Sequence, residues 1–197
     1  MKLIYPPGAT PIDDISGIIP KHITTQGDLD EAEFANVNKA YQKYFLGGLS
    51  DRKAPFTFEW ILVVHREMFG EVWDWAGQIR KTQPNVGIAP AQIQVSLHQL
   101  LGNLKTWEES QMDPIEISAR LHHELVRIHP FKNGNGRWAR LITNIYQRKL
   151  KRALFQWPEK ALKEEGDFRK YYIDALKKAD RGDFKSFIQI HREHQES

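Results

Sequence analysis

Residues 129–140 read HPFKNGNGRWAR and run directly into apolar residues at helical spacing. Two glycines flank Asn135, and residues without a Cβ let consecutive backbone N–H groups turn toward an anion. The N-terminus of the following helix adds N–H groups without intrahelical acceptors and the positive end of a helix dipole. Arg137 and Arg140 are three residues apart and project from one helix face. This stretch therefore predicts a phosphate-binding loop between two helices.

His129 lies at the other end of this loop, where an apolar-periodic helix ends. A histidine with its ordinary pKa of about 6.5 is partly neutral near pH 7 and can accept a proton from a hydroxyl. Taken singly, the glycines could form a simple helix-to-helix turn and His129 could be a packed core residue. Together, these residues predict a phosphate site that contains its own base.

The same residue types at the same spacing resemble the core motif of the Fic (filamentation induced by cAMP) and Doc family, His-x-Phe-x-acidic-Gly-Asn-Gly-Arg-x-x-Arg. The matching residues are His129, Phe131, Gly134, Asn135, Gly136, Arg137 and Arg140. Asn133 departs from the pattern, because the family usually has Asp or Glu there to hold Mg²⁺, and an Asn carbonyl offers no charge. We expect weaker metal dependence, a metal held mainly by the nucleotide phosphates, or reduced activity.

The resemblance extends over nearly the whole chain. Residues 65–77 (HREMFGEVWDWAG) are similar to the family's helix leading into its target-docking hairpin, the flap, which we expect at about residues 78–90. Residues 171–188 resemble the helix pair that closes the far side of the nucleotide pocket. Residues 5–11 (YPPGATP) and 19–26 (IPKHITTQ) resemble a bacterial subgroup known as mobile mystery protein B.

The resemblance implies an enzyme that transfers AMP from ATP to a Ser, Thr or Tyr hydroxyl of a target protein. His129 would act as the general base, and Phe131 would anchor the loop in the core. The implied nucleotide-binding residues are Asn133, Gly134, Asn135, Gly136, Arg137 and Arg140, with Asp180 near the adenine. The implied flap residues, which would dock the target by β-augmentation, are Arg80, Lys81, Thr82, Gly87 and Ile88. Mg²⁺ or Mn²⁺ is expected, held mainly by the phosphates, with Asn133 as a weak ligand.

Fic proteins are often restrained by a helix carrying Ser or Thr, three residues, Glu, then Gly or Asn, whose Glu pairs with the second motif arginine. Residues 161–166 (ALKEEG) have the Glu-Gly but an alanine where the hydroxyl belongs, and residues 28–36 lack the spacing. We therefore expect either a separate inhibitory partner or a degenerate restraint.

Two other activities remain open at the same site. Doc-type proteins transfer a phosphoryl group with the nucleotide reversed, although the intact Gly-Asn-Gly disfavours that reaction. A nucleotide-binding regulatory module without turnover is the second alternative, because of Asn133. His122 and His123 are interpreted as packing or surface histidines, since a zinc site needs more ligands than this segment offers.

The chain has 197 residues and 41% hydrophobic content, which suits one sizeable core. We interpret residues 1–27, with four of the ten prolines, as an N-terminal arm and residues 28–197 as one domain. No apolar run approaches the roughly 20 residues that span a bilayer, and the N-terminus has no signal-peptide core. A chain without cysteine has no disulfide, so a cytoplasmic location is expected. The net charge of +3 comes from interspersed charges, so nucleic-acid binding is not expected, and the sequence does not determine the oligomeric state.

Apolar spacing is helical along most of the chain. We therefore expect a mainly α fold, a Fic-type bundle of about seven or eight helices with one short β-hairpin at the flap. The first helix should bury the stripe Phe34, Val37, Tyr41 and Phe45. Thr57 should cap the second helix, and Asp113 followed by Pro114 should begin the helix that ends at His129.

Overall fold

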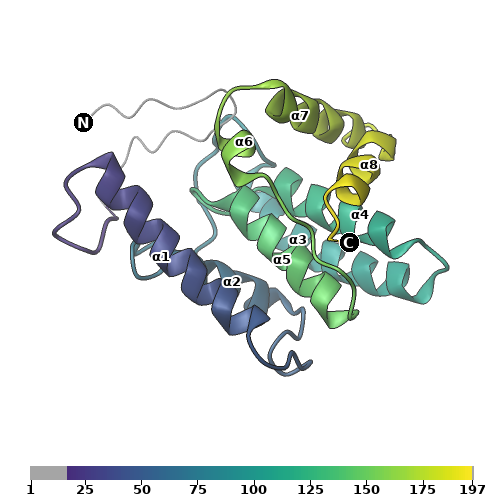
Figure 1. Ribbon diagram of the computed structural model, residues 1–197, viewed down its shortest axis with the longest axis horizontal. Coiled ribbons are helices and arrows are strands. Elements are labelled where there is room, and N and C mark those ends of the chain that lie inside the picture. Colours follow the sequence, from purple (N-terminus) through teal and green to yellow (C-terminus); the bar gives the residue numbers. More distant parts are fainter. Residues whose placement is uncertain (1–16, 197) are drawn as a thin grey trace.

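The computed structural model describes residues 17–196 and is mainly helical (Figure 1). Within this range the helices are α1 (Gln26–Phe45), α2 (Phe58–Phe69), α3 (Pro90–Glu109), α4 (Pro114–Ile128), α5 (Asn135–Lys149), α6 (Glu159–Lys163), α7 (Asp167–Ala179) and α8 (Lys185–Glu193). The prediction of a mainly α bundle of seven or eight helices is confirmed. Most of the predicted arm, including residues 5–11, lies outside the described residues. None of the helices described is both long and apolar enough to cross a membrane.

The helices pack as neighbouring pairs around α4 and α5 (Figure 1). The α1–α2 pair lies on one side of this centre and the α7–α8 pair on the other. The main hydrophobic core joins α1 to α5, and a second, smaller cluster lies under α7 and α8, where α4 contributes Ala119. The α4–α5 connection, which contains the motif, is anchored in the main core through Ile128 and Phe131.

Local signals place the beginnings of α2 and α4 as predicted. Thr57 caps α2 by accepting a hydrogen bond from Trp60 N, and Asp113 caps α4 by accepting one from Ile115 N. α4 ends at Ile128, and His129 is its C-cap in the left-handed region, with φ of 52°. The motif loop then runs to Gly134, directly before α5.

The first helix buries a different face from the predicted one. It begins at Gln26 behind a capping box formed by Thr25 and Asp28. Its buried residues are Leu29, Glu33, Asn36, Ala40 and Tyr44, whereas Phe34 and Tyr41 are exposed. The predicted stripe is wrong for Phe34 and Tyr41, because buried polar side chains on the other face find partners. Asn36, for example, donates to Glu67 O and accepts from Glu71 N.

The predicted β-hairpin at the flap is not formed, since no residue from 78 to 89 lies in a strand. The reason is the Arg80 side chain, whose guanidinium donates to the carbonyl oxygens of Thr82 and Ile88 at 2.9 and 2.5 Å. Strand pairing would require such carbonyls to accept from backbone N–H groups across the hairpin. The flap is therefore a loop that closes around an arginine.

Candidate functional site

The motif loop is anchored in the core by Phe131 and Asn135. The Phe131 ring is fully buried and packs edge-on against Trp138, with 4.9 Å between ring centroids. Asn135 Oδ1 accepts from Phe131 N and its Nδ2 donates to Phe131 O, both at 2.9 Å. Asn135 is one of the predicted phosphate-binding residues, and its side chain is thus committed to the loop. What Asn135 can offer an anion is its backbone N–H at the start of α5.

His65, on α2, holds the loop from the other side. Its ring stacks on Phe131 with 3.6 Å between centroids, and its Nδ1 accepts from Gly77 N at 3.0 Å. The remaining ring nitrogen, Nε2, therefore carries the proton and donates to the Asn133 carbonyl oxygen at 3.0 Å. Burial lowers the pKa of His65 to about 3, so the ring is neutral at pH 7. No sequence signal distinguished this histidine as part of the site.

His129 is held as a neutral base. Its pKa is lowered to about 4, mainly by burial and also by the charge of Arg80, while a ring N–H hydrogen bond to the Val126 carbonyl opposes this shift. That hydrogen bond fixes which nitrogen carries the proton, so the second ring nitrogen presents a lone pair. The partly buried ring can therefore accept a proton at neutral pH.

The flap lies directly against His129. Gly87 has φ of +96°, and a Cβ added there would lie 2.5 Å from His129 Cβ and 2.8 Å from Arg80 Nη2. Arg80 is 3% exposed, and its Nε donates to the His129 carbonyl oxygen at 2.6 Å. Its acceptors are backbone carbonyls, so Arg80 anchors the flap rather than presenting its side chain to a target. Among the other predicted flap residues, Lys81 and Thr82 are exposed and Ile88 is partly buried.

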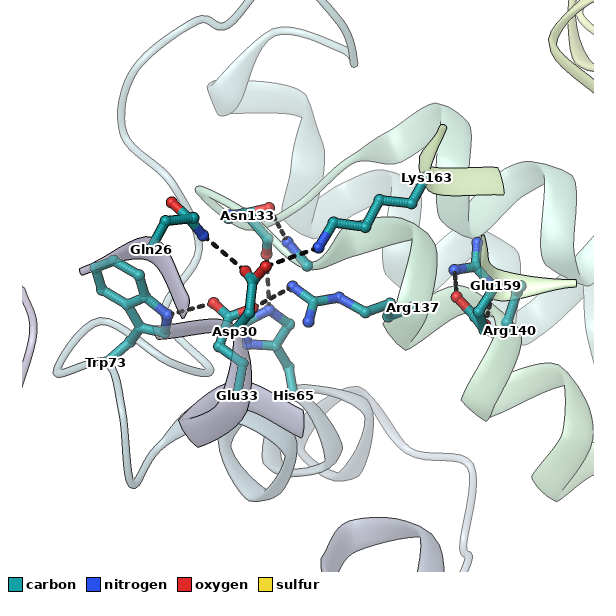
Figure 2. A network of polar contacts seen from close by, with 11 residues as sticks. Gln26, Asp30, Glu33, His65, Trp73, Asn133, Arg137, Arg140, Glu159 and Lys163 are labelled. Carbon is teal, nitrogen blue, oxygen red and sulfur yellow. Dashed lines mark hydrogen bonds and ion pairs between the residues drawn. The ribbon is translucent and has the colours of Figure 1, made fainter. Parts of the chain in front are cut away.

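Arg137, the first motif arginine, pairs with a carboxylate from α1 (Figure 2). Its Nη2 lies 2.8 Å from Glu33 Oε2, and its guanidinium lies over the Phe69 ring at 4.7 Å from the centroid. The other Glu33 oxygen accepts from Trp73 Nε1 at 2.7 Å. Glu33 is 6% exposed, so the pair is buried on the carboxylate side.

Arg140, the second motif arginine, pairs with a carboxylate from α6 (Figure 2). Its Nε and Nη2 donate to the two oxygens of Glu159 at 2.7 and 2.5 Å. The side chain of Glu159 is 55% exposed, whereas that of Arg140 is 10% exposed. A Cβ at Gly136 would lie 3.2 Å from Arg140 Nη1, so the guanidinium also faces the start of α5.

The residues around Asn133 do not fit a metal held by the protein. Asn133 Oδ1 accepts from Gly134 N at 2.6 Å, so the amide oxygen is engaged within the loop. Among residues 17–196, no group of three or more His, Cys, Asp or Glu side chains is arranged to hold a metal ion. Gly134 itself is required here, because it has φ of +77° and an added Cβ would lie 2.6 Å from the Phe69 ring.

Asp180 lies at the end of α7, beside α4. Its Oδ1 lies 2.9 Å from His123 Nε2, and its side chain is half exposed. His123 is buried, as is His122, in agreement with the interpretation of these residues as packing histidines. Asp180 is thus bound to α4 through His123, on the same end of the helix as the motif.

The structure brings these groups to one place. The loop carries a neutral base at one end and a helix N-terminus at the other, with two guanidinium groups on the first turns of that helix. A polyphosphate fits the second end, because N–H groups, the helix dipole and the arginines all favour negative charge.

Comparison with known proteins gives a consistent result. A sequence model of the Fic/DOC family matches residues 55–147. The chain is 31% identical over 156 residues to protein adenylyltransferase Fic of Culex quinquefasciatus, which covers 77% of this chain and 30% of that protein. It is 34% identical over 154 residues to protein adenylyltransferase fic-1 of Caenorhabditis briggsae, covering 76% and 29%. The chain thus spans about a third of the length of these curated relatives.

Solved structures share the fold. Fic-1 (residues 134–508) of C. elegans is 25% identical with a TM-score of 0.69, covering 89% of this chain and 51% of that one. The Bartonella tribocorum BepC protein, solved with bound AMPPNP, is 17% identical with a TM-score of 0.67, covering 98% and 95%. The likeness to the BepC protein is one of fold alone. With the motif residues gathered into one site, the matched family model and the shared fold, the chain belongs to the Fic/DOC family.

Proposed function

We propose that this chain is a protein adenylyltransferase that transfers AMP from ATP to a Ser, Thr or Tyr hydroxyl of a target protein. The observation that carries the proposal is that a neutral histidine and an anion-binding helix N-terminus occupy the two ends of one short, anchored loop. Curated relatives at 31% and 34% identity bear the name protein adenylyltransferase, which supports the same activity.

In the proposed reaction, the target hydroxyl attacks the α-phosphorus of ATP. The second ring nitrogen of His129 takes the hydroxyl proton as the new O–P bond forms, and the bond from the α-phosphorus to pyrophosphate breaks. The backbone N–H groups of Gly136 and its neighbours, with Arg137 and Arg140, stabilise the charge that collects on the phosphates and the departing pyrophosphate. Asp180 is proposed near the adenine.

The nucleotide is proposed to bring its own divalent cation, bound by the phosphates. The engaged Asn133 oxygen and the missing carboxylate at this position favour that arrangement over a metal held by the protein.

Two guanidinium–carboxylate pairs affect how readily ATP can bind to the site. Glu33 and Glu159 hold the groups that the phosphates would contact. Binding of ATP therefore requires phosphate oxygens to compete with these carboxylates. A separate inhibitory partner, as expected from the sequence, would strengthen that competition.

The proposed target-docking surface is the exposed outer side of the flap, with Lys81 and Thr82. Because the flap crosses His129 at Gly87, a target segment lying along it would bring its hydroxyl to the base. The segment has no strands, so docking by β-augmentation would require the flap to extend when the target binds.

The test uses ATP labelled at the α- or the γ-phosphate, with Mg²⁺ or Mn²⁺, and follows label on the protein itself and on proteins of a cell lysate. The proposal expects α-label transfer that falls at least about 100-fold in His129→Ala, while ATP affinity changes little. Transfer of γ-label would instead indicate Doc-type phosphoryl transfer. ATP binding with neither transfer would favour the regulatory module.

A further inference from the structure

The buried Arg80 side chain joins the flap to the end of α4, where the base His129 lies. Its Nε donates to the His129 carbonyl oxygen at 2.6 Å, while Nη1 and Nη2 donate to the carbonyl oxygens of Thr82 and Ile88. The backbone N–H of Arg80 donates to the Pro130 carbonyl oxygen at 2.9 Å. One residue therefore binds carbonyl groups of both the flap and the motif loop.

The backbone of His129 is in a conformation that side chains other than glycine seldom adopt. Its φ and ψ are 52° and 60°, in the left-handed region, where a Cβ is unfavourable. Such a conformation persists only where the surrounding structure holds it. Because these two angles set the direction in which the imidazole leaves the chain, whatever holds them also places the base.

The hydrogen bonds of Arg80 are suited to hold this backbone. The last carbonyl groups of a helix have no intrahelical donor and lie at the negative end of the helix dipole. A guanidinium offers them a positive charge and several N–H groups in a fixed plane, and its hydrogen bonds are stronger than those of a neutral donor. The His129 carbonyl oxygen, at 2.6 Å from Arg80 Nε, receives such a bond directly after the left-handed turn.

The flap closes tightly over this arrangement at Gly87. A Cβ added to Gly87 would lie 2.8 Å from Arg80 Nη2 and 2.5 Å from His129 Cβ, so the guanidinium and the base both touch the flap backbone. The charge of Arg80 also contributes, after burial, to the lowered pKa of His129, as expected for a cation this close. A displaced guanidinium would therefore change both the position of the base and its surroundings.

We propose that Arg80 is a positioning residue for the reaction, whose guanidinium fixes the left-handed backbone of His129 and so directs the base toward the target hydroxyl. The inference rests on the proposed function, because it takes His129 as the base. It goes beyond anchoring of the flap, since the same side chain then places both the base and the surface on which the target docks. The competing explanation is that Arg80 only shapes the flap and satisfies buried carbonyl groups.

Transfer rates and ATP affinities test this role. Arg80→Gln removes the charge and the planar donors, and Arg52→Gln makes the same change at an exposed arginine. We expect Arg80→Gln to lower the rate of α-label transfer at saturating ATP about 10- to 100-fold and to change ATP affinity less than about twofold, because only the base is displaced. Arg80→Lys, which keeps the charge without the planar donors, should lie between Arg80→Gln and the wild type. Arg52→Gln should match the wild type.

A double-mutant cycle separates positioning of the base from docking of the target. In a His129→Ala background, Arg80→Gln should cause no further loss of transfer, since Arg80 acts through His129. A role in the flap alone would lower transfer in both backgrounds. The proposal is overturned by a folded Arg80→Gln variant with an unchanged transfer rate, by a loss that persists without His129, or by an equal loss of ATP affinity.

Spectra without nucleotide decide the inference even if no label is transferred. The carbon-13 shifts of His129 Cα and Cβ report its backbone angles. In Arg80→Gln they should leave their left-handed values while those of Asn135 stay in place, and unchanged His129 shifts would overturn the proposal. If the Arg80 variants do not fold, the wild type should show a scalar coupling across the hydrogen bond from Arg80 Nε to the His129 carbonyl carbon. Absence of that coupling would also overturn the proposal.

Discussion

The motif loop and the two motif arginines are held in opposite ways. The loop backbone is fixed by Phe131, Asn135 and His65, none of which carries a charge at pH 7. The arginines are held by the carboxylates of Glu33 and Glu159. A phosphate can compete for an arginine but not for the contacts of the loop. The difference indicates a permanent scaffold that holds the base, beside cationic groups whose partners can be exchanged.

The two arginines also differ from each other. Glu33 is nearly buried and is bound by Trp73 as well as by Arg137, so displacing it would leave a buried carboxylate to be solvated. Glu159 is largely in solvent and can move away at little cost. Arg140 is therefore the easier of the two to transfer from carboxylate to phosphate.

Acidification should have the largest effect, because protonation of buried neutral histidines lowers the stability of the fold. His65, His129 and His191 have folded-state pKa values of about 3, 4 and 4, below the ordinary value of 6.5. The unfolded chain therefore takes up protons first, and stability is lost as the pH falls below about 6.5 and on toward 4. The loss should approach about 1.4 kcal/mol per histidine per pH unit.

Urea unfolding at several pH values measures this dependence. Stability that stays constant between pH 6.5 and 5 would contradict the account of neutral, buried histidines.

Asn135→Ala should break the loop itself. It removes both side-chain bonds to Phe131 and leaves a buried N–H and a buried C=O without partners, at a cost of about 2–4 kcal/mol. Transfer of AMP should fall with it, because the loop no longer sets the distance between base and phosphate. Thermal unfolding and label transfer measure both effects. The exposed Asn103→Ala is the matched control, and equal effects in the two variants would contradict the role of Asn135.

Gly87→Ala should impair the action of the base His129 while leaving ATP binding nearly unchanged. The added methyl group would meet His129 Cβ at 2.5 Å and would occupy a left-handed backbone conformation. We expect kcat to fall roughly 10- to 100-fold, because the base is displaced, with ATP affinity nearly unchanged. Gly48→Ala, where an added Cβ meets nothing within 4 Å, is the control. A large loss of ATP affinity with unchanged kcat would argue against this separation.

Glu159→Gln tests whether Arg140 exchanges its carboxylate partner for phosphate more readily than Arg137 does. Removing the competing charge leaves Arg140 available to phosphate, so ATP should bind about three- to tenfold more tightly. Glu33→Gln should gain less, because the buried pair also fixes Trp73. Calorimetric titration of both variants measures the order. A weaker affinity in Glu159→Gln would show that the carboxylate supports the site instead of competing for it.

The parts of the site that the sequence predicted are the local ones. The caps at Thr57 and Asp113, the glycine-bounded loop and the position of His129 at a helix end all depend on residues within a few positions of one another. Periodicity alone misplaced the buried face of α1, because Glu33 and Asn36 are polar and their partners lie far along the chain. The prediction of a flap hairpin was wrong for a similar reason, because the buried Arg80 side chain binds backbone carbonyl oxygens that the turn residues alone do not reveal.

The partners of the arginines could not be predicted at all. Glu33 comes from α1 and Glu159 from α6, and neither lies in a pattern that distinguishes it from the other acidic residues. Such contacts are set by how the helices pack, which single-sequence spacing does not encode.

The central claim, that ATP takes Arg140 from its carboxylate while the scaffold stays in place, can be tested on the unmodified protein. The Nε–H signals of Arg80 and Arg140 report on the two classes of contact, because Arg80 Nε donates to the His129 carbonyl and Arg140 Nε to Glu159. Titration with ATP, followed by nitrogen-15 spectroscopy, should shift the Arg140 signal and leave that of Arg80 in place. An Arg140 signal unchanged at saturating ATP, or an equal shift of both signals, would contradict the claim.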